Sequence, residues 1–121
     1  MENAKQAFLA SILNEAIGEK YAGLLLGKDG EPDRHIILLP GEAQSVNFAD
    51  AKKFAASVGG ELPTRRMQSL LFANLKEEFA SAWYWSGEQR ESGSAWVQDF
   101  LSGYQYWSYT SIKCRARAVR S

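Results

Sequence analysis

The sequence predicts an α+β fold in which two helices pack on short antiparallel sheets. Two short apolar runs flank a turn-rich segment near residue 30, two capped segments with helical spacing follow, and period-two patterns with short turns fill the last third. A chain of 121 residues fits one such domain, for which we expect the bounds 20–121.

An additional amphipathic helix is expected ahead of that domain, over residues 1–19. Its apolar residues recur at helical spacing and form one stripe: Leu9, Ile12, Leu13, Ala16 and Ile17. Gly18 would help to end it. Such a stripe needs a partner, which is either the domain's own sheet or the same helix of another copy, as in a homo-oligomer.

The first strands are expected at residues 21–27 and 35–39, which form a hairpin because the intervening K-D-G-E-P-D favours a turn. His35, in the second of these strands, is the only histidine. We expect it to have a surface or edge role. No metal site and no cofactor are expected, since the usual metal sites draw on several histidines or cysteines.

Two helices are expected next. Asn47 caps the first, whose buried stripe is Ala51, Phe54, Ala55 and Val58 and whose end is the Gly59-Gly60 pair. Thr64, after Leu62-Pro63, caps the second, whose buried stripe is Met67, Leu70, Leu71 and Leu75. Arg65 and Arg66 oppose the dipole of this second helix. Either they are solvated, or an acidic neighbour or ligand offsets them.

After residue 79 the pattern predicts an antiparallel meander. Strands are expected at residues 83–86, 95–101, 105–110 and 112–120, with a mobile polar loop at 87–94 and a tight turn at 102–104. In the last strand, Cys114, Ala116 and Ala118 share one face and Lys113, Arg115 and Arg117 the other. The basic face is either solvated or a stripe that binds phosphate or acid. Cys114 is expected to be a buried, inert thiol.

Residues 83–109 have the composition of a recognition surface. They contain all four Trp residues and nine of the fifteen aromatic residues, interleaved with Ser, Gly and Gln rather than with aliphatic residues. Alternation along the strand places Trp107 and Tyr109 in the core, over the Cys114 face, and displays Tyr104 and Tyr106. The ligand-binding residues predicted on this basis are Glu88, Gln89, Arg90, Tyr104 and Tyr106.

Composition excludes several classes of partner and compartment. Lysine plus arginine equal aspartate plus glutamate at 14 each, so no global field attracts nucleic acid or an anionic membrane. One cysteine cannot form an internal disulfide. The sequence shows neither a signal-peptide pattern nor an apolar run of membrane-spanning length. We therefore expect a protein that is cytoplasmic at synthesis.

The run N-F-A-D-A-K-K-F-A-A-S-V-G-G-E-L-P-T-R, from Asn47 to Arg65, resembles the signature of the C-type-lectin-like fold. That fold is shared by formylglycine-generating (sulfatase-modifying) enzymes and many phage proteins. W-Y-W-S-G-E, A-W-V-Q-D-F, S-G-Y and R-A-R-A-V-R are similar to motifs of a phage and prophage family of unknown function with the same fold. The resemblance covers about residues 21–121 and implies a C-type-lectin-like fold and a phage origin, with association with the virion as one expectation.

The resemblance also bears on activity. Formylglycine-generating relatives handle copper and oxygen with cysteines, and only Cys114 is present here, so that activity is not expected. Calcium-dependent lectins use a Glu-Pro-Asn-like loop before a late strand, whereas Glu31-Pro32-Asp33 lies in the first hairpin. Variable proteins of diversity-generating retroelements share the fold and vary their C-terminal strands. Residues 85–120 look like such a region in position and composition, although analogy of fold does not fix function.

The sequence therefore predicts a non-catalytic protein that binds a protein or glycan through its C-terminal face. One alternative is a phage accessory protein that acts on a host factor or on nucleic acid, because aromatic rings and a basic terminal strand can stack bases and hold phosphates. Another is an enzyme, for which no motif links the candidate groups Glu88, Glu91, Asp99, His35 and Cys114.

Overall fold

The computed structural model describes residues 17–121 and is an α+β structure with two α-helices and two sheets. Of the helix predicted over residues 1–19, residues 1–16 lie outside the described part of the chain. In the described part, Gly18 has a left-handed φ of 92° and the buried Glu19 pairs with Arg120, with 2.7 Å between oxygen and nitrogen. This ion pair ties the start of the described chain to its last strand.

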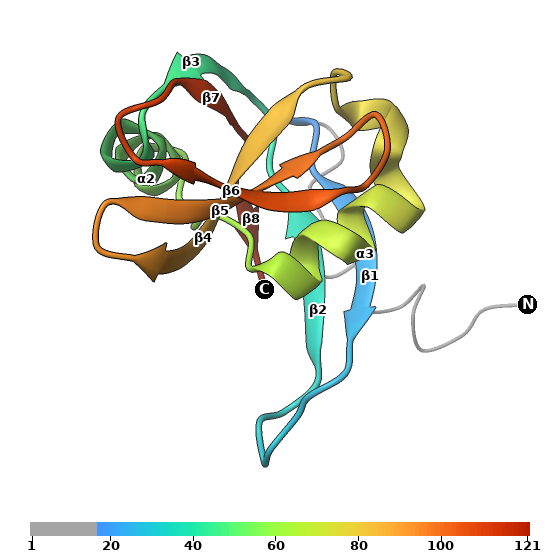
Figure 1. The fold of residues 1–121 in the computed structure, drawn as a ribbon. Coiled ribbons are helices and arrows are strands. Elements are labelled where there is room, and N and C mark those ends of the chain that lie inside the picture. The colour runs from blue at the N-terminus through green and yellow to red at the C-terminus, as the bar shows by residue number, and fades with distance from the viewer. Residues whose placement is uncertain (1–16) are drawn as a thin grey trace, which may run out of the picture.

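The smaller sheet has the order β1 (Lys20–Leu25), β2 (Arg34–Leu38) and β8 (Val119–Arg120). β1 and β2 form the antiparallel hairpin that the turn residues predict, and its tip projects away from the body of the molecule in Figure 1. The hydroxyl of Tyr21 lies 2.7 Å from Nδ1 of His35 across the two strands. β8 returns from the far end of the sequence to pair antiparallel with β2.

Both predicted helix starts are confirmed. In α2 (Phe48–Ser57), the side chain of Asn47 accepts from the backbone N–H of Asp50 at 2.9 Å. In α3 (Arg65–Leu75), Oγ1 of Thr64 accepts from the backbone N–H of Met67 at 3.2 Å. A 3-10 turn, η2 (Lys76–Glu78), follows α3. No helix in residues 17–121 combines the length and the apolar character needed to cross a membrane.

The larger sheet has the order β3-β7-β4-β5-β6. The strands are β3 (Ala43–Val46), β4 (Trp83–Glu91), β5 (Ser94–Asp99), β6 (Gln105–Tyr109) and β7 (Cys114–Ala116). β4 and β7 pair in parallel, and the other neighbours pair antiparallel. The sheet is therefore mixed rather than a pure meander.

Two strand predictions for the C-terminal region are wrong. Residues 87–91 are not loop but the outer half of β4, which pairs with β5 up to Glu91 and Ser94. Only Ser92 and Gly93 turn, and Gly93 has a positive φ of 83°, which glycine adopts without strain. The predicted strand 112–120 is two short strands, β7 and β8, which belong to different sheets.

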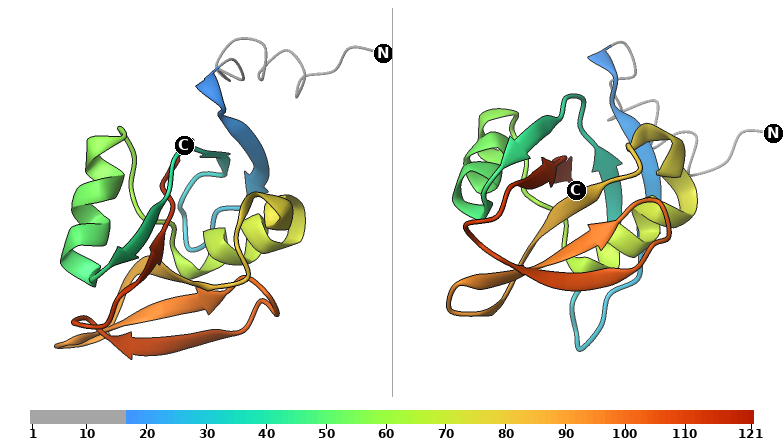
Figure 2. Two further views of the ribbon diagram at one scale, coloured as in Figure 1. Left: turned by 90° about the horizontal axis from the view of Figure 1, so that it is seen from above. Right: turned by 45° about the horizontal axis from the view of Figure 1, so that its top comes forward.

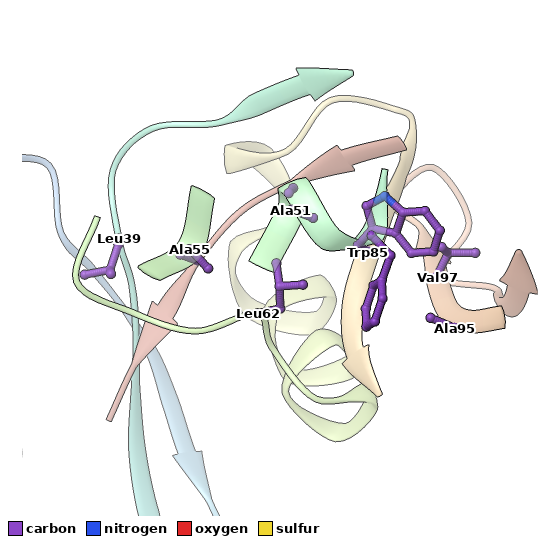
Figure 3. Close-up of a cluster of buried hydrophobic side chains, with 10 residues drawn as sticks. Leu39, Ala51, Ala55, Leu62, Trp85, Ala95 and Val97 are labelled. Atoms are coloured by element: carbon purple, nitrogen blue, oxygen red, sulfur yellow. The ribbon is translucent and has the colours of Figure 1, made fainter. Parts of the chain in front are cut away.

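Two apolar clusters hold the helices on the sheet. Trp85, which has no exposed surface, packs with Phe48 and Ala51 of the α2 segment and with Ala95 and Val97 of β5 (Figure 3). The adjacent residue, Tyr84, is in the second cluster, together with Phe100 of the turn after β5 and with Met67 and Leu71 of α3. Because neighbouring side chains of a strand point to opposite faces, α2 covers one face of β4 and α3 the other.

The interpretation of the C-terminal basic residues as a solvated face is wrong for Arg117, which is buried, whereas Lys113 is exposed. Arg117 is only 9% exposed and donates to the carbonyl oxygens of Glu78 and Leu39, at 2.7 and 2.8 Å. Arg115 pairs with Glu42 at 2.6 Å, and Arg120 pairs with Glu19. These arginines hold together segments that are distant in sequence, because the break between β7 and β8 turns the strand inward at Arg117.

Candidate functional site

The outer part of the larger sheet displays its side chains in two sets. Cross-strand pairing aligns Trp85 with Val97 and Val97 with Tyr106, so these residues share the face that α2 partly covers. On the opposite face, Tyr84 aligns with Gln98 and Gln98 with Gln105, under α3. β6 is the terminal strand of this sheet and lies at the rim of the molecule in Figure 2.

Three exposed rings follow one another on the α2 side of the sheet. Trp83, Tyr104 and Tyr106 are 39%, 60% and 48% exposed. The Trp83 and Tyr104 ring centroids are 6.4 Å apart, edge to face, and the Tyr104 and Tyr106 centroids are 6.0 Å apart, stacked. We call Trp83, Tyr104 and Tyr106 the aromatic row. Rings that pack on one another and still face solvent are pre-positioned for contact with a ligand.

A groove of about 420 Å³ lies beside the aromatic row. Trp83 and Tyr106 form part of its wall, and residues 112–115 form another part. Ile112 and Lys113 contribute an exposed apolar and an exposed basic side chain to that wall. The groove therefore joins apolar area to a few polar groups, which is the usual make-up of a binding site.

The opposite face of the same strands carries two stacked pairs of arginine and tryptophan. The guanidinium carbon of Arg65 lies 3.7 Å from the ring centroid of Trp96, and that of Arg90 lies 4.4 Å from the centroid of Trp107. Trp96 and Trp107 are themselves cross-strand partners in β5 and β6. Cation–π contacts of this kind hold both guanidiniums over the tryptophan rings. We call these four residues the arginine–tryptophan stack.

Glu88, on β4, caps the N-terminus of α3. Its carboxylate accepts from the backbone N–H of Arg65 at 2.6 Å, so an acidic neighbour does offset the two arginines that open the helix. Nearby, Gln105 donates from Nε2 to the side-chain oxygen of Gln98 at 2.7 Å and accepts from Nε of Arg65 at 3.1 Å. This polar network fixes the start of α3 on the sheet.

The five residues predicted to bind ligand are thus divided by the sheet. Tyr104 and Tyr106 belong to the aromatic row on one face, and Arg90 belongs to the arginine–tryptophan stack on the other. Glu88 is engaged by α3, and Gln89 is exposed on β4, where it pairs with Ala95 of β5. A loop at 87–94 would let these residues converge, whereas β4 fixes the side of the sheet on which each of them lies.

The prediction that Tyr104 and Tyr106 are displayed is confirmed, whereas the placement of their neighbours in the core is wrong for Tyr109. Tyr109 is 62% exposed and Trp107 is partly exposed. The buried indole is Trp85, which packs in the same cluster as Ala116 and Ala118. β4 and β5 separate β6 from β7, so no side chain of the edge strand is needed to cover the Cys114 face.

The pKa values of Cys114 and Tyr84 are raised, and the candidate acid Asp99 is engaged in hydrogen bonds. Burial raises the pKa of the Cys114 thiol to about 11. Burial, and then the hydrogen bond to Glu42, raise the pKa of Tyr84 to about 12. Asp99 accepts from the backbone N–H of Leu101 and from Oγ of Ser102, both at 3.0 Å. Among residues 17–121, no cluster of three or more His, Cys, Asp or Glu side chains is placed to hold a metal ion.

A second cleft, of about 590 Å³, was not predicted from the sequence. It lies between the tip of the β1–β2 hairpin and the start of α3, and its lining includes Lys28, Glu31, Arg66 and Glu88. Arg66 crosses it to donate to the carbonyl oxygen of Leu26 at 2.8 Å. No local sequence pattern could have indicated this cleft, because its walls come from segments about forty residues apart.

Comparison with known proteins adds no relative to this description. No protein-family model matches the chain, and a search of curated proteins found no match.

Proposed function

We propose that this chain is a non-catalytic binding protein that holds a protein or glycan ligand on its aromatic row. The observation that carries the proposal is the exposure of Trp83, Tyr104 and Tyr106, as three neighbouring rings, beside a groove. Large apolar rings are costly to leave in water, and clusters of them on a surface mark interaction sites. Tyrosine and tryptophan also dominate the energetics of known binding interfaces.

The proposed fold is C-type-lectin-like. Its support is the order of elements: a hairpin, two capped helices, a sheet that carries the aromatic residues, and a terminal strand that returns beside the hairpin. The R-A-V-R segment that carries part of the resemblance contains β8, whose pairing with β2 brings the two ends of the described chain together. With the fold we also propose a phage or prophage origin and, for residues 85–120, diversification by a retroelement.

The diversification proposal has a direct test in the coding DNA. A near-copy of the 3′ end beside a reverse transcriptase gene, differing at adenines, would support it. In that case the varying codons should fall on exposed positions such as Tyr104, Tyr106 and Tyr109 and spare the buried Trp85. A coding region with no such copy would contradict diversification and leave a phage accessory protein.

A non-catalytic role agrees with the state of the candidate acids, bases and nucleophile. Glu88 is engaged at the start of α3, and Asp99 stabilises the turn after β5. The Cys114 thiol has a raised pKa, which disfavours the thiolate that a nucleophile needs. Glu88 and Asp99 thus have structural contacts, and the Cys114 thiol is poorly suited to act as a nucleophile.

Binding can be tested with a random-peptide display library and a glycan array as probes. A probe selected by the wild-type chain should bind Tyr106→Ala at least about fivefold more weakly, which corresponds to about 1 kcal/mol. Ser111→Ala, at an exposed position outside the aromatic row, is the matched control. Binding that survives the loss of Tyr104 and Tyr106 together would contradict the proposal, as would the absence of any selected probe.

An oligo-dT single strand tests the nucleic-acid alternative in the same assay. The arginine–tryptophan stack offers both charges and rings to such a ligand, but the terminal arginines are already paired within the protein. Affinity for the oligonucleotide that falls steeply with salt and survives Tyr106→Ala would favour nucleic acid over protein or glycan.

A further inference from the structure

β6 is the one long edge strand of the described sheets that has no protection against pairing. Edge strands in natural proteins are usually shielded by bulges, charges, proline or covering groups. β1 has a register shift between Tyr21 and Gly23, and Asn74 of α3 donates to the carbonyl oxygen of Ala22 at 2.6 Å. β3 also has a register shift, and β8 has two residues and a bridge to Glu61.

β6 differs in each of these respects. Its sequence, Q-Y-W-S-Y, contains no charged residue, no glycine and no proline. It pairs with β5 over five consecutive residues without a register shift, from Gln105 to Tyr109. Within residues 17–121 no strand pairs with its other side, and it forms the rim of the larger sheet in Figure 2. Such an edge is a template for another strand.

The backbone groups on the free side of β6 can be assigned from the pairing pattern. The N–H of Asp99 donates to the carbonyl oxygen of Tyr104, and the N–H of Thr110 donates to that of Gly93. Antiparallel pairing alternates, so the even-numbered residues of β6 bond to β5. The N–H and C=O groups of Gln105 and Trp107 therefore point away from β5, as does the N–H of Tyr109.

A second β6 strand fits this free side about a twofold axis at Trp107. In that antiparallel register Trp107 lies opposite its own equivalent and Gln105 lies opposite Tyr109. The two Trp107 residues can then exchange N–H to C=O hydrogen bonds, and the N–H of each Tyr109 can donate to the C=O of the opposite Gln105. On the other face of the strand Tyr106 lies opposite Ser108, a large side chain against a small one. β6 itself contains no charged residue, and the guanidinium of Arg90, on β4, lies over its Trp107 ring.

The side chains give a reason to choose a copy of this chain over an unrelated peptide. Tyr109 is 62% exposed, and its ring packs edge to face with the partly exposed Trp107, at 5.3 Å between centroids. The twofold register places the Trp107 rings of the two copies side by side and covers the Tyr109 rings. Cross-strand aromatic pairs of this kind stabilise a sheet. The chain thus supplies both halves of the interface.

We propose that two copies of this chain associate through their β6 strands, antiparallel and centred on Trp107, to form one continuous ten-stranded sheet from the two five-stranded sheets. The two aromatic rows then lie on the same sheet surface and are related by the twofold axis. Such an arrangement would present two copies of the proposed ligand site to a multivalent partner. The assembly itself does not depend on that site having a ligand.

The oligomeric state of the full chain is the first measurement. Sedimentation velocity over a range of concentrations should show a reversible transition from 13.5 kDa to twice that mass. A chain that remains monomeric at about 1 mM has a dimer dissociation constant above that concentration, and this result would overturn the proposal.

A pair of matched charge variants tests the surface and the register. Tyr106 and Ser108 face each other across the proposed interface, so Tyr106→Lys with Ser108→Lys places like charges opposite each other and should weaken dimerisation at least about tenfold. Tyr106→Lys with Ser108→Glu places opposite charges there and should dimerise more tightly than the double-lysine variant. Equal dimerisation of the two variants, with both folded by circular dichroism, would overturn the proposal.

Cysteine cross-linking gives an independent measure of the same register. Directly opposed residues that do not share hydrogen bonds have Cα atoms about 4.5 Å apart, within reach of a disulfide. In a Cys114→Ala background, a mixture of Tyr106→Cys and Ser108→Cys chains should oxidise to a mixed dimer faster than either variant alone. A dimer that shows no such preference would place the interface elsewhere.

The charge variants also separate assembly from the proposed ligand site. Both the Tyr106→Lys, Ser108→Lys chain and the Tyr106→Lys, Ser108→Glu chain lack Tyr106, so a difference between them in dimerisation cannot arise from ligand binding.

Discussion

The carboxylate of Glu88 accepts a hydrogen bond of 2.6 Å from the backbone N–H of Arg65, the first residue of α3. The helix opens with two arginines, whose charges oppose the positive end of its dipole. A carboxylate supplied by β4 offsets that cost and satisfies an N–H that has no partner inside the helix. The start of α3 is therefore stabilised by a residue 23 positions later in the sequence.

We predict that Glu88→Ala lowers the free energy of unfolding by about 1 kcal/mol, as loss of a helix-capping group does. Urea denaturation at low ionic strength measures the loss, and about 1 M salt should reduce it because Glu88 is exposed. Gln89→Ala, the adjacent exposed residue on β4, is the matched control and should be nearly neutral. Equal stability of wild type and Glu88→Ala would show that the contact contributes nothing.

Trp85, in the core, and Trp107, on the edge strand, should differ in their contribution to stability. Trp85 has no exposed surface and donates from Nε1 to the carbonyl oxygen of Val46 at 2.8 Å. Trp85→Ala should therefore cost about 3–5 kcal/mol, as for other large-to-small changes in a core. Trp107→Ala should cost less than half as much, because its ring is partly exposed on an edge strand, where Arg90 and Tyr109 contact it. Chemical denaturation of both variants decides this, and a larger loss for Trp107 would contradict the assignment of the core.

The helices and the first hairpin could be predicted because their signals are local. Asn47 and Thr64 are capping residues followed by apolar residues at helical spacing, and both caps form. β3 could not be predicted in the same way. It is four residues long, and a register shift interrupts its pairing with β7, so it has no repeating apolar pattern. The outer half of β4 also has none, because both of its faces are exposed.

The candidate site was predicted in part, for a related reason. Alternation correctly separated Tyr106 from Trp107, since it follows from backbone geometry alone. The further assumption, that one of the two faces must be core, fails for the far end of an edge strand. There both faces reach solvent, and Tyr106 and Tyr109 are exposed on opposite sides of the same strand. Which strand lies at the edge depends on the sheet order, and the sequence carries no local signal for that order.

The ionisation of Tyr84 should make the protein less stable at high pH. Its folded pKa is raised to about 12, against about 10 in an unfolded chain. The folded state therefore favours the protonated phenol, and this contribution is complete below about pH 10 and is lost as the pH rises towards 12. Two pH units correspond to at most about 3 kcal/mol.

The matched variant for this prediction is Tyr84→Phe, which keeps the ring but cannot ionise. It should be less stable than wild type at pH 8, because the Tyr84 hydroxyl donates to Glu42 and accepts from the backbone N–H of Ala80. The difference should shrink between about pH 10 and 12, measured by urea denaturation at each pH. A difference that stays constant across this range would show that the pKa of Tyr84 is not raised.

Cys114 should react slowly with alkylating reagents in the folded protein. It is partly buried in β7, and burial raises the pKa of its thiol to about 11 from an ordinary value near 9. At pH 8 this lowers the thiolate fraction about 100-fold. The greater nucleophilicity of a more basic thiolate recovers about tenfold, which is half of the loss on a logarithmic scale, so the net decrease in rate is about tenfold. Restricted access lowers the rate further. Iodoacetamide labelling, followed by mass spectrometry, should therefore be at least about tenfold slower in the native protein than in urea at the same pH.

The pH dependence of the labelling rate separates the effect of the raised pKa from simple shielding of the thiol. The rate in the native protein should still rise tenfold per pH unit between pH 8 and 10, whereas the rate in the unfolded protein levels off above pH 9. A native rate that levels off near pH 9 would contradict the raised pKa.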